Sequence, residues 1–391
     1  MNKRYQLIPS GIALAVGAAL FISTTGFASA ASLVSNVALE SAAVGYATQN
    51  GGTYGGRDAT SSHIYLVDNI SDFKSALEAA EDAPSIIQIR GTIDISNGQS
   101  YQNFDDEKAR SQLKIPSNTT IIGVDSNAGF INGSLVMSHV NNVIIRNIKI
   151  ETPVDVAPKY EEGDGWNAEW DSMSVTYSKN IWVDHVTFDD GSFTDADYST
   201  VNGEEYVQHD GELDIKHGSD FVTVSFSVFK NHNKTMLIGH SQSNSGEDAG
   251  HLRVTLVDNI FDHIVQRTPR VRFGKVHAFN NVFKGDYKDP TYRYMYSFGL
   301  GYEGSIRSEN NAFMIDHLKT SKQCKVVSVK KDNSSFSDSG STFNGSALDL
   351  SGCSLPTSNL SWSVPYSYQL HEPQNLDSWL TQNAGASHLS I

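Results

Sequence analysis

The sequence predicts an all-β solenoid, a right-handed parallel β-helix with an N-terminal capping helix and flanking loops. One short phrase recurs along the chain, as DNIF at residues 258–261, NNVF at 280–283 and NNAF at 310–313, at intervals of 22 and 30 residues. Looser copies lie upstream, NVIIRNI at 142–148 and NIWVDHVTF at 180–188. Repeats of this length indicate stacked coils, and the short β-rich runs around each phrase indicate that the coils are made of strands.

The interior of such a coil is expected to hold the Val, Ile and Phe residues of each repeat. The Asn residues are expected at the corners, where their side chains hydrogen-bond from one coil to the next. Insertions between the coils, at 189–207 and 241–250, are then loops on the flank of the solenoid. Solenoids usually carry their binding site on such a face.

The two ends of a solenoid need covers. The segment 71–80 predicts a capping helix with Ser71 as its N-cap and Pro84 beyond its end. Its apolar face would consist of Phe73, Ala76, Leu77 and Ala80. The stretch 333–363, rich in Ser, Asn and Gly, is expected to be irregular or edge-like. With the tail around Trp379 and Leu380, it would cover the side and the last coils.

The first thirty residues have the pattern of a signal peptide. Lys3 and Arg4 precede an apolar run from about 12 to 22, and a small-residue site ends at Ala30. We expect cleavage after Ala30, a single domain from 31 to 391, and secretion to the extracellular space. The apolar run is too short for a membrane span, so we expect no membrane association. We also expect the mature chain to be a monomer.

The chain is acidic, with a formal net charge of −15, which becomes about −17 when Lys3 and Arg4 are removed. Such a surface does not favour nucleic acid as a partner, and any polyanion must be met locally by cations or by a bridging metal. The two cysteines, Cys324 and Cys353, are expected to form a disulfide in an exported protein rather than two free thiols.

A basic cluster stands out in this acidic chain. The run QRTPRVRFG at 266–274 places Arg267, Arg270 and Arg272 around Pro269. Pro269 removes a ladder donor and bends the chain, so Arg267 and Arg272 would converge on one cleft and bind a polyanion. A solvated basic edge strand is the alternative interpretation.

An acidic cluster lies about fifty residues earlier, in QHDGELD at 208–214. Extended backbone would place Asp210, Glu212 and Asp214 on one face, and carboxylates so close repel one another unless a cation lies among them. Oxygen ligands of this kind suit calcium, with Asp171 as a further candidate from a neighbouring segment. Surface carboxylates or turn caps remain the alternative.

Four motifs, in order along the chain, resemble those of the extracellular pectate lyases of polysaccharide lyase family one. They are WVDH at 182–185, DGELD at 210–214, KTMLIGHS at 234–241 and QRTPRVRFG at 266–274. The likeness runs from Gly45 to about residue 386. It implies a parallel β-helix, calcium dependence and cleavage of polygalacturonate by β-elimination, which yields 4,5-unsaturated oligogalacturonides.

Carried over by position, the resemblance makes Asp171, Asp210 and Asp214 the calcium ligands. It makes Arg267 the catalytic base, and it makes Lys234 and Arg272 the cations that hold substrate carboxylates. His185 in the WVDH motif is expected in a structural corner ladder, and Lys216, His217 and His240 are expected to be scaffold residues near the site. Glu212 is left open between metal contact and exposure.

Three alternatives remain at this point. Arg267 would act as a third carboxylate clamp if it is not the base. A pectin lyase would share the fold and the elimination but take methyl-esterified chains without calcium. A non-catalytic polysaccharide-binding β-helix would bind the polymer without forming unsaturated products.

Overall fold

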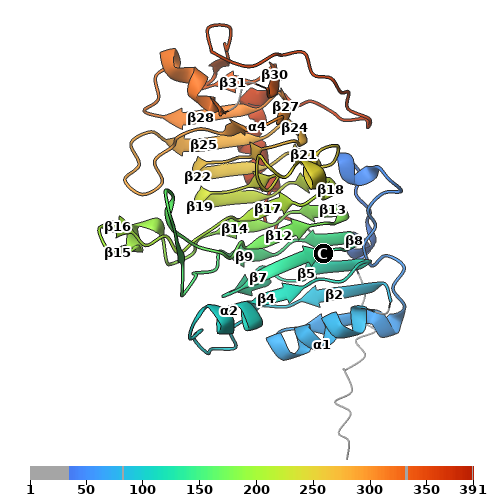
Figure 1. The fold of residues 1–391 in the computed structure, drawn as a ribbon. Helices are drawn as coiled ribbons and strands as arrows, with labels where there is room; N and C mark the ends of the chain where they lie inside the picture. Colours follow the sequence, from blue (N-terminus) through green and yellow to red (C-terminus); the bar gives the residue numbers. More distant parts are fainter. Residues whose placement is uncertain (1–34, 82, 331–332, 390) are drawn as a thin grey trace, which may run out of the picture.

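The computed structural model describes residues 35–81, 83–330, 333–389 and 391, and it confirms the predicted right-handed parallel β-helix. Coils are stacked along one axis, with α1 near one end and α4 along the side (Figure 1). The predicted signal peptide at 1–30 lies outside the described residues. None of the helices in the described part of the chain has the length and apolar character of a membrane span.

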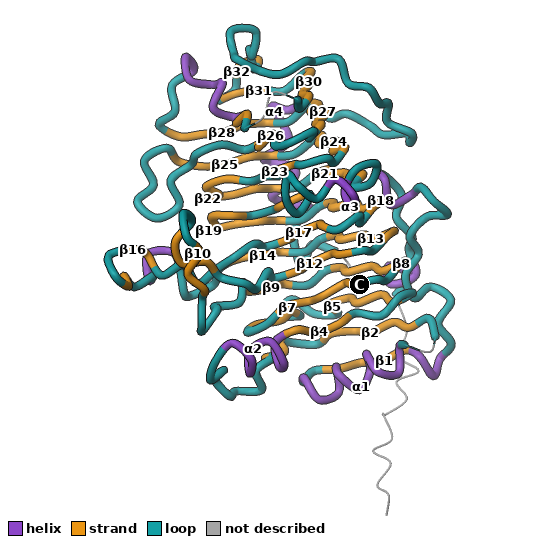
Figure 2. The backbone as a smooth tube through the Cα atoms, in the orientation of Figure 1, coloured by secondary structure: helices purple, strands orange, loops and turns teal. Residues whose placement is uncertain are grey.

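Three sheets run the length of the solenoid, and their strands are parallel except for the final pair of sheet B (Figure 2). Sheet A contains β1 Ile64–Val67, β2 Ser85–Ile89, β5 Thr119–Gly123, β8 Asn141–Arg146, β13 Lys179–Asp184, β18 Asp220–Ser225, β21 Arg253–Val257, β24 Lys275–Phe279, β27 Ser305–Glu309 and β30 Ser335–Ser339. Sheet B contains β3 Thr92–Asp94, β6 Gly129–Ile131, β9 Lys149–Glu151, β14 Thr187–Asp189, β19 Val228–Lys234, β22 Ile260–Gln266, β25 Val282–Asp286, β28 Ala312–Asp316, β31 Thr342–Phe343 and β32 Ser346–Ala347. Sheet C contains β4 Gln112–Lys114, β7 Ser134–Ser138, β12 Met173–Thr176, β17 Leu213–Lys216, β20 Leu237–Ile238, β23 Arg270–Val271, β26 Phe298–Leu300 and β29 Val327–Val329.

Shorter elements fill the connections. The antiparallel pairs β10 Lys159–Glu161 with β11 Gly165–Asn167, and β15 Thr200–Val201 with β16 Glu204–Glu205, project beside the coils on the flank predicted for the 189–207 insertion (Figure 1). The α-helices are α1 Ile70–Ala80, α2 Phe104–Ser111, α3 Ser245–Asp248 and α4 Pro373–Asn383. The 3-10 helices are η1 Asn36–Leu39, η2 Tyr46–Thr48, η3 Ser61–His63, η4 Asp195–Asp197 and η5 Thr320–Val326.

The predicted ladders are present. The phenylalanines of sheet B lie almost flat on one another through five coils, with ring centroids 4.7 to 5.0 Å apart. These residues are Phe188, Phe229, Phe261, Phe283 and Phe313, each at most 1% exposed. Equivalent residues of successive coils therefore sit one strand spacing apart, which is the register that the repeated phrases require.

A second ladder is polar and runs along a corner. Asn259 Nδ2 donates to Asn281 Oδ1 at 3.0 Å, and Asn281 Nδ2 donates to Asn311 Oδ1 at 3.0 Å, all three side chains being fully buried. The residue before each ladder Asn in the later repeats, such as Asn280 and Asn310, has a left-handed φ of 56° and 48°. Asn tolerates this conformation better than most residues. The first Asn of each pair therefore turns the chain, and the second hydrogen-bonds the polar groups of the corner.

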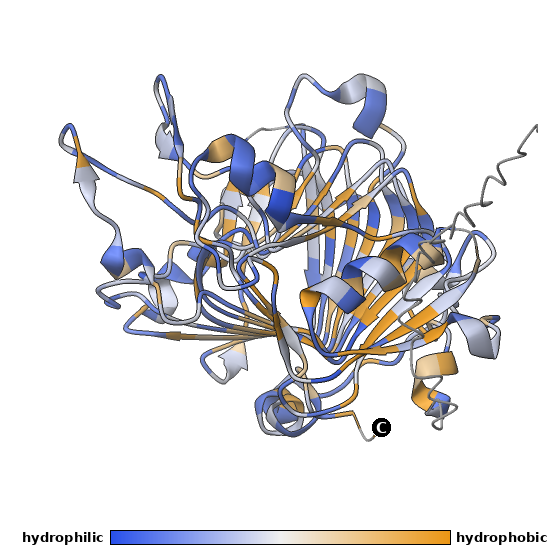
Figure 3. Ribbon diagram, turned by 90° about the horizontal axis from the view of Figure 1, so that it is seen from below, coloured by the Kyte–Doolittle hydropathy of each residue, from blue (hydrophilic) through white to orange (hydrophobic). Residues whose placement is uncertain are grey.

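The capping helix is confirmed, but its N-cap is Asn69 rather than Ser71. The Asn69 side chain accepts a hydrogen bond from the Asp72 backbone N–H at 3.0 Å, so the helix starts at Ile70. Asn competes with Ser for this position because both present a short oxygen acceptor. The predicted apolar face is buried, and Figure 3 looks onto this end, with apolar residues gathered between the sheets.

The stretch 333–363 is edge-like and then irregular, as expected. It includes β30, the edge strand of sheet A, and the pair β31 and β32 at the end of sheet B, before it becomes irregular. Helix α4 lies on the outer face of sheet B, where Leu376 and Leu380 contact Ile260, Val282 and Ala312. The tail therefore covers the side of the solenoid, as predicted.

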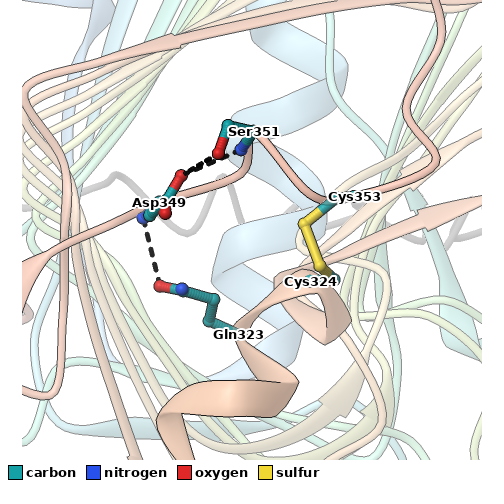
Figure 4. The surroundings of a disulfide bond; sticks show 5 residues. All are labelled: Gln323, Cys324, Asp349, Ser351 and Cys353. Carbon is teal, nitrogen blue, oxygen red and sulfur yellow. Dashed lines mark hydrogen bonds between the residues drawn. A yellow bond between two sulfur atoms is a disulfide. The ribbon is translucent and has the colours of Figure 1, made fainter.

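The predicted disulfide is present. Cys324 in η5 is bonded to Cys353, 29 residues later, and closes this part of the chain beside the last strands of sheet C. Nearby, Gln323 Oε1 accepts from the Asp349 N–H at 3.1 Å (Figure 4). The bond holds η5 to the irregular C-terminal segment.

The corner ladder should contribute strongly to stability. Asn281→Ala would leave the Asn259 N–H and the Leu256 carbonyl without their partner, and we expect it to lower the free energy of unfolding by about 2 to 4 kcal/mol. Urea denaturation followed by circular dichroism measures this. The exposed Asn127→Ala is the control and should change stability by less than about 0.5 kcal/mol. Equal effects of the two substitutions would contradict the role given to the ladder.

Candidate active site

Sheet C and its corner with sheet B hold the predicted site residues. In β17, Leu213 and Ile215 point into the core, so Asp214 and Lys216 face outward. Asp171 precedes β12, which pairs with β17 in parallel. The carboxylates of adjacent coils meet here around Gly211, where an added Cβ would lie 2.7 Å from Asp171 Oδ1 and 2.8 Å from Asp214 Oδ1.

A lysine lies between these two carboxylates. Lys216 Nζ is 3.2 Å from Asp171 Oδ2 and 3.0 Å from Asp214 Oδ2. Burial lowers the pKa of Lys216, but the two carboxylates outweigh it, so the pKa is raised and the ammonium keeps its charge. Lys216 was expected to be scaffold, and the structure places it at the centre of the acidic cluster.

The predicted acidic residues lie close enough to affect one another. Burial, followed by the charge of Asp214, raises the pKa of Asp171 and of Asp210, and Lys234 and Lys216 oppose this at Asp210. Closely spaced hard oxygens of this kind fit calcium. In the described part of the chain, no three His, Cys, Asp or Glu side chains are gathered closely enough to hold a metal by themselves. A cation here would complete its shell with other oxygens.

The prediction that Glu212 shares a face with Asp210 and Asp214 is wrong. Glu212 is fully buried, and neither carboxylate oxygen has a hydrogen-bond partner among the described residues. Burial raises its pKa well above the usual range, and the nearby His232 opposes this. The strand begins only at Leu213, so period-two alternation does not extend back through residues 210–212.

The buried side chain of His232 contacts the backbone of Asp210. His232 Nε2 lies 2.7 Å from the Asp210 carbonyl oxygen, and His232 Nδ1 lies 2.6 Å from Asp190 Oδ1. Tyr292 donates its hydroxyl to Asp190 Oδ2 at 2.9 Å. Burial lowers the pKa of His232, but Asp190 and Glu212 raise it to about 10. Both ring nitrogens therefore carry protons and donate, which fixes the backbone of the acidic segment.

Lys234 is the last residue of β19, at the corner that leads into sheet C. Its Nζ donates to Asn167 Oδ1 at 2.5 Å, at the end of the β10–β11 hairpin. Its partner in β22 is Gln266, the residue before Arg267. Lys234 and Arg267 thus come from adjacent coils at the same corner.

The basic cluster is not an edge strand. Strand β23 is inside sheet C, between β20 and β26, and Arg267 and Phe273 on either side of it have left-handed φ values of 64° and 57°. The resulting two-residue strand buries Val271 and leaves the arginines on the outer side. Burial, followed by Arg270 and Arg267, lowers the pKa of Arg272 to about 10, so the guanidinium groups lie within electrostatic reach of one another.

These arginines have unused donors. Arg272 Nη1 donates to the carbonyl oxygens of Gly239 at 3.1 Å and His240 at 2.8 Å. In contrast, the buried Nε of Arg267 and the buried Nε of Arg270 have no hydrogen-bond partner among the described residues. A buried charged donor without an acceptor is costly, and an anionic ligand would satisfy both.

The structure therefore brings all six predicted site residues to one surface. Sequence reasoning named Arg270 in the basic cluster but gave it no role at the site, and it missed Lys216 between the carboxylates, Asn167 beside Lys234 and the buried His232 beneath Asp210. Lys216 had a usable signal, because it lies two residues after Asp214 within a strand. Asn167 and His232 carry none, since their roles depend on contacts between different coils.

The histidines predicted to be scaffold are so placed. His185 stacks on Phe226 at 5.0 Å and lies 2.8 Å from Asp184 Oδ2. His217 and His240 stack on one another at 4.5 Å beside the site. Their faces are used in protein contacts, which suits support rather than catalysis.

Comparison with known proteins agrees with this geometry. The family model described as pectate lyase matches residues 13–389. Pectate lyase A of Dickeya chrysanthemi is 57% identical over 92% of this chain and 92% of its own length, and a pectate lyase E of the same organism is 54% identical over 97% and 94%. A solved structure of a pectate lyase bound to a hexasaccharide superposes with a TM-score of 0.84 at 30% identity, covering 91% of this chain and all of the other.

The buried His232–Asp190 pair predicts a specific pH dependence. Because the folded pKa of His232 is raised from its ordinary 6.5 to about 10, its contribution is fully present below about pH 6.5 and is lost as the pH rises through about 10. We expect His232→Gln to destabilise the protein at pH 6.5 by roughly 2 kcal/mol more than at pH 10.5. Chemical denaturation at both values measures this, with the exposed His263→Gln as control. A difference that does not change with pH would contradict a charged His232.

Proposed function

Because the chain belongs to the pectate lyase family, we propose that it cleaves α-1,4-linked polygalacturonate by calcium-dependent β-elimination and releases 4,5-unsaturated oligogalacturonides. The observation that carries this proposal is the pairing of two opposite clusters on one surface. Arg267 and Arg272 lie within electrostatic reach of Asp210 and Asp214, and the buried Nε atoms of Arg267 and Arg270 have no hydrogen-bond partner among the described residues. A polymer of uronate units has the anionic groups to satisfy these donors, and a calcium ion held by the carboxylates would supply further positive charge.

Calcium would be held by Asp171, Asp210 and Asp214, and when bound it neutralises charge that develops on the substrate carboxylate. Lys216 already compensates two of these carboxylates, at 3.2 and 3.0 Å, which keeps them close together. The buried His232 holds the backbone of Asp210 in place. The ligand segment is therefore preorganised by protein contacts alone.

Lys234 and Arg272 would bind the carboxylates of the substrate next to the scissile bond. Their charges are present before reaction, so they stabilise both the bound substrate and the transition state. Asn167 orients the Lys234 ammonium, and the Gly239 and His240 carbonyls orient the Arg272 guanidinium. This fixes the sugar ring relative to Arg267.

Arg267 would remove the proton from C5, as a neutral guanidine. The C5–H electron pair forms the C4–C5 double bond, and the C4–O4 bond breaks with its electrons on the leaving sugar oxygen. A guanidinium is not normally deprotonated, and general-base action by Arg267 requires the neutral form. Burial, followed by the charges of neighbouring arginines, lowers the pKa values of Arg270 and Arg272 in the same cluster.

We further infer that the chain is exported by cleavage after Ala30 and acts outside the cell as one domain, from 31 to 391, and as a monomer. The charged and apolar pattern of the first thirty residues supports export. The net charge of −15 supports the absence of a nucleic-acid partner.

The function has a direct test. Polygalacturonate incubated with the mature protein should give a rising ultraviolet absorbance from the unsaturated product, and a calcium chelator should abolish the rise until calcium is restored. Asp214→Ala should be inactive at limiting calcium while keeping its β-rich circular dichroism, because solenoid stability is spread over many coil contacts.

Other outcomes would identify a different protein. Chelator-resistant cleavage of highly methyl-esterified pectin would identify a pectin lyase. Binding of the polymer without any absorbance change would identify a non-catalytic module.

The base and the clamps should differ in kinetic signature. We expect Arg267→Ala to remove almost all turnover but to keep oligogalacturonate affinity within about tenfold, or about 1.4 kcal/mol. Lys234→Ala should raise KM and also lower kcat. Calorimetric titration of Arg267→Ala in calcium, beside steady-state rates for Lys234→Ala, measures both. If Arg267→Ala lost affinity in proportion to rate, Arg267 would be a third clamp.

A further inference from the structure

The 241–250 insertion carries a buried carboxylate that the proposed chemistry does not use. Asp248 is the last residue of the short helix α3 in this insertion, and its side chain is fully buried (Figure 2). Asn244, the N-cap of α3, donates from Nδ2 to Asp248 Oδ2 at 3.0 Å. A buried carboxylate is stable only when hydrogen bonds replace the water that it has lost, so its remaining donors show what it holds in place.

Both oxygens of this carboxylate accept from backbone N–H groups in two successive coils. Asp248 Oδ1 accepts from the Gly218 N–H at 2.9 Å, and Oδ2 accepts from the His240 N–H at 3.0 Å. Gly218 follows β17, which carries Asp214 and Lys216. His240 follows β20, the neighbour of β17 in sheet C. One carboxylate therefore ties the turn beyond the acidic cluster to the turn beside the basic cluster.

A single peptide group links Asp248 to Arg272. The Gly239–His240 peptide is trans, so its N–H and its C=O point in opposite directions. The N–H donates to Asp248 Oδ2, and the carbonyl oxygen of Gly239 accepts from Arg272 Nη1 at 3.1 Å. The next carbonyl, that of His240, accepts from the same Nη1 at 2.8 Å. Carboxylate, peptide and guanidinium thus form a chain of hydrogen bonds in which each bond polarises the next.

The turn is also in close backbone contact with Arg272. Gly239 has a φ of 91°, and an added Cβ would lie 2.3 Å from the Arg272 carbonyl oxygen. The Arg272 N–H donates to the Ile238 carbonyl oxygen at 2.8 Å, just before this turn. With so little space between the two backbones, a displacement of the turn is transmitted directly to Arg272.

We propose that Asp248 is a positioning residue for Arg272, one of the two cations expected to bind substrate carboxylates. Asp248 holds the 239–240 turn so that two carbonyl oxygens fix the orientation of the guanidinium. Its negative charge also strengthens the Gly239 carbonyl as an acceptor. Without Asp248, Arg272 keeps its charge but loses its fixed orientation. The inference rests on the proposed function for the identity of the anion that Arg272 binds.

The test is a double-mutant cycle of Asp248→Asn and Arg272→Ala. An Asn side chain has no charge and only one acceptor oxygen, so one of the two backbone N–H groups loses its partner. We expect Asp248→Asn to lower kcat/KM on polygalacturonate roughly tenfold, with a raised KM. In the Arg272→Ala background the same substitution should change kcat/KM by less than about twofold, because the residue through which it acts is gone. Calorimetric titration with trigalacturonate in calcium should give the same pattern for affinity.

Two further variants separate positioning from folding. Asp94→Asn is the matched control, because Asp94 also accepts from two backbone N–H groups, those of Ser96 and Gly98, but lies in the first strand of sheet B. It should leave kcat/KM unchanged. Asn244→Ala removes one donor to Asp248 Oδ2 and serves if Asp248→Asn does not fold. Its smaller loss of kcat/KM should also disappear in the Arg272→Ala background.

Three outcomes would overturn the proposal. Losses of equal size with and without Arg272 would show that Asp248 acts on the fold as a whole, and an equal loss in Asp94→Asn would show the same. Amide hydrogen exchange at His240 that is no faster in Asp248→Asn than in wild type would show that the tether is absent. This last measurement needs no ligand. If the wild-type chain formed no unsaturated product, the proposed function would fail, and the titrations and the exchange rates would still test Asp248.

Discussion

The stacking of parallel coils in register is the constraint on which the rest of this structure depends. The backbone N–H and C=O groups of each strand find hydrogen-bond partners only if the next coil follows the same path. The Phe and Asn ladders keep successive coils one strand spacing apart. Residues far apart in the chain thereby become neighbours. Asp171 and Asp214 are 43 positions apart but belong to adjacent coils, as do Lys234 and Arg267.

The same stacking places like charges together on the surface. Two carboxylates that repel one another share Lys216, and the buried Nε donors of Arg267 and Arg270 have no acceptor in the part of the chain that the structure describes. A loose loop would relieve both repulsions by moving apart. A rigid solenoid does not, because its backbone is fixed by hydrogen bonds to the coils on either side, so both kinds of charge stay concentrated on one surface.

The buried ion pair beneath the surface fixes the position of the acidic segment. His232 and Asp190 are removed from solvent and paired, and the imidazolium proton that is not used by Asp190 reaches the backbone of the acidic segment. On the outer side, hairpins and loops supply Asn167 and the His240 carbonyl to orient the cations. The coils thus provide the frame, and the connections between coils provide the fine orientation of each side chain.

The sequence by itself determined the coil architecture, the capping helix, the pairing of Cys324 with Cys353 and the identity of the charged motifs, because these depend on local periodicity or on residue type. Only the tertiary structure decided that Asn69 caps α1, that Glu212 turns away from Asp214 and that Lys216 sits between two carboxylates. Alternation predicts a face only within a strand, and residues 210–212 precede one. Contacts between coils depend on register, which no single repeat contains.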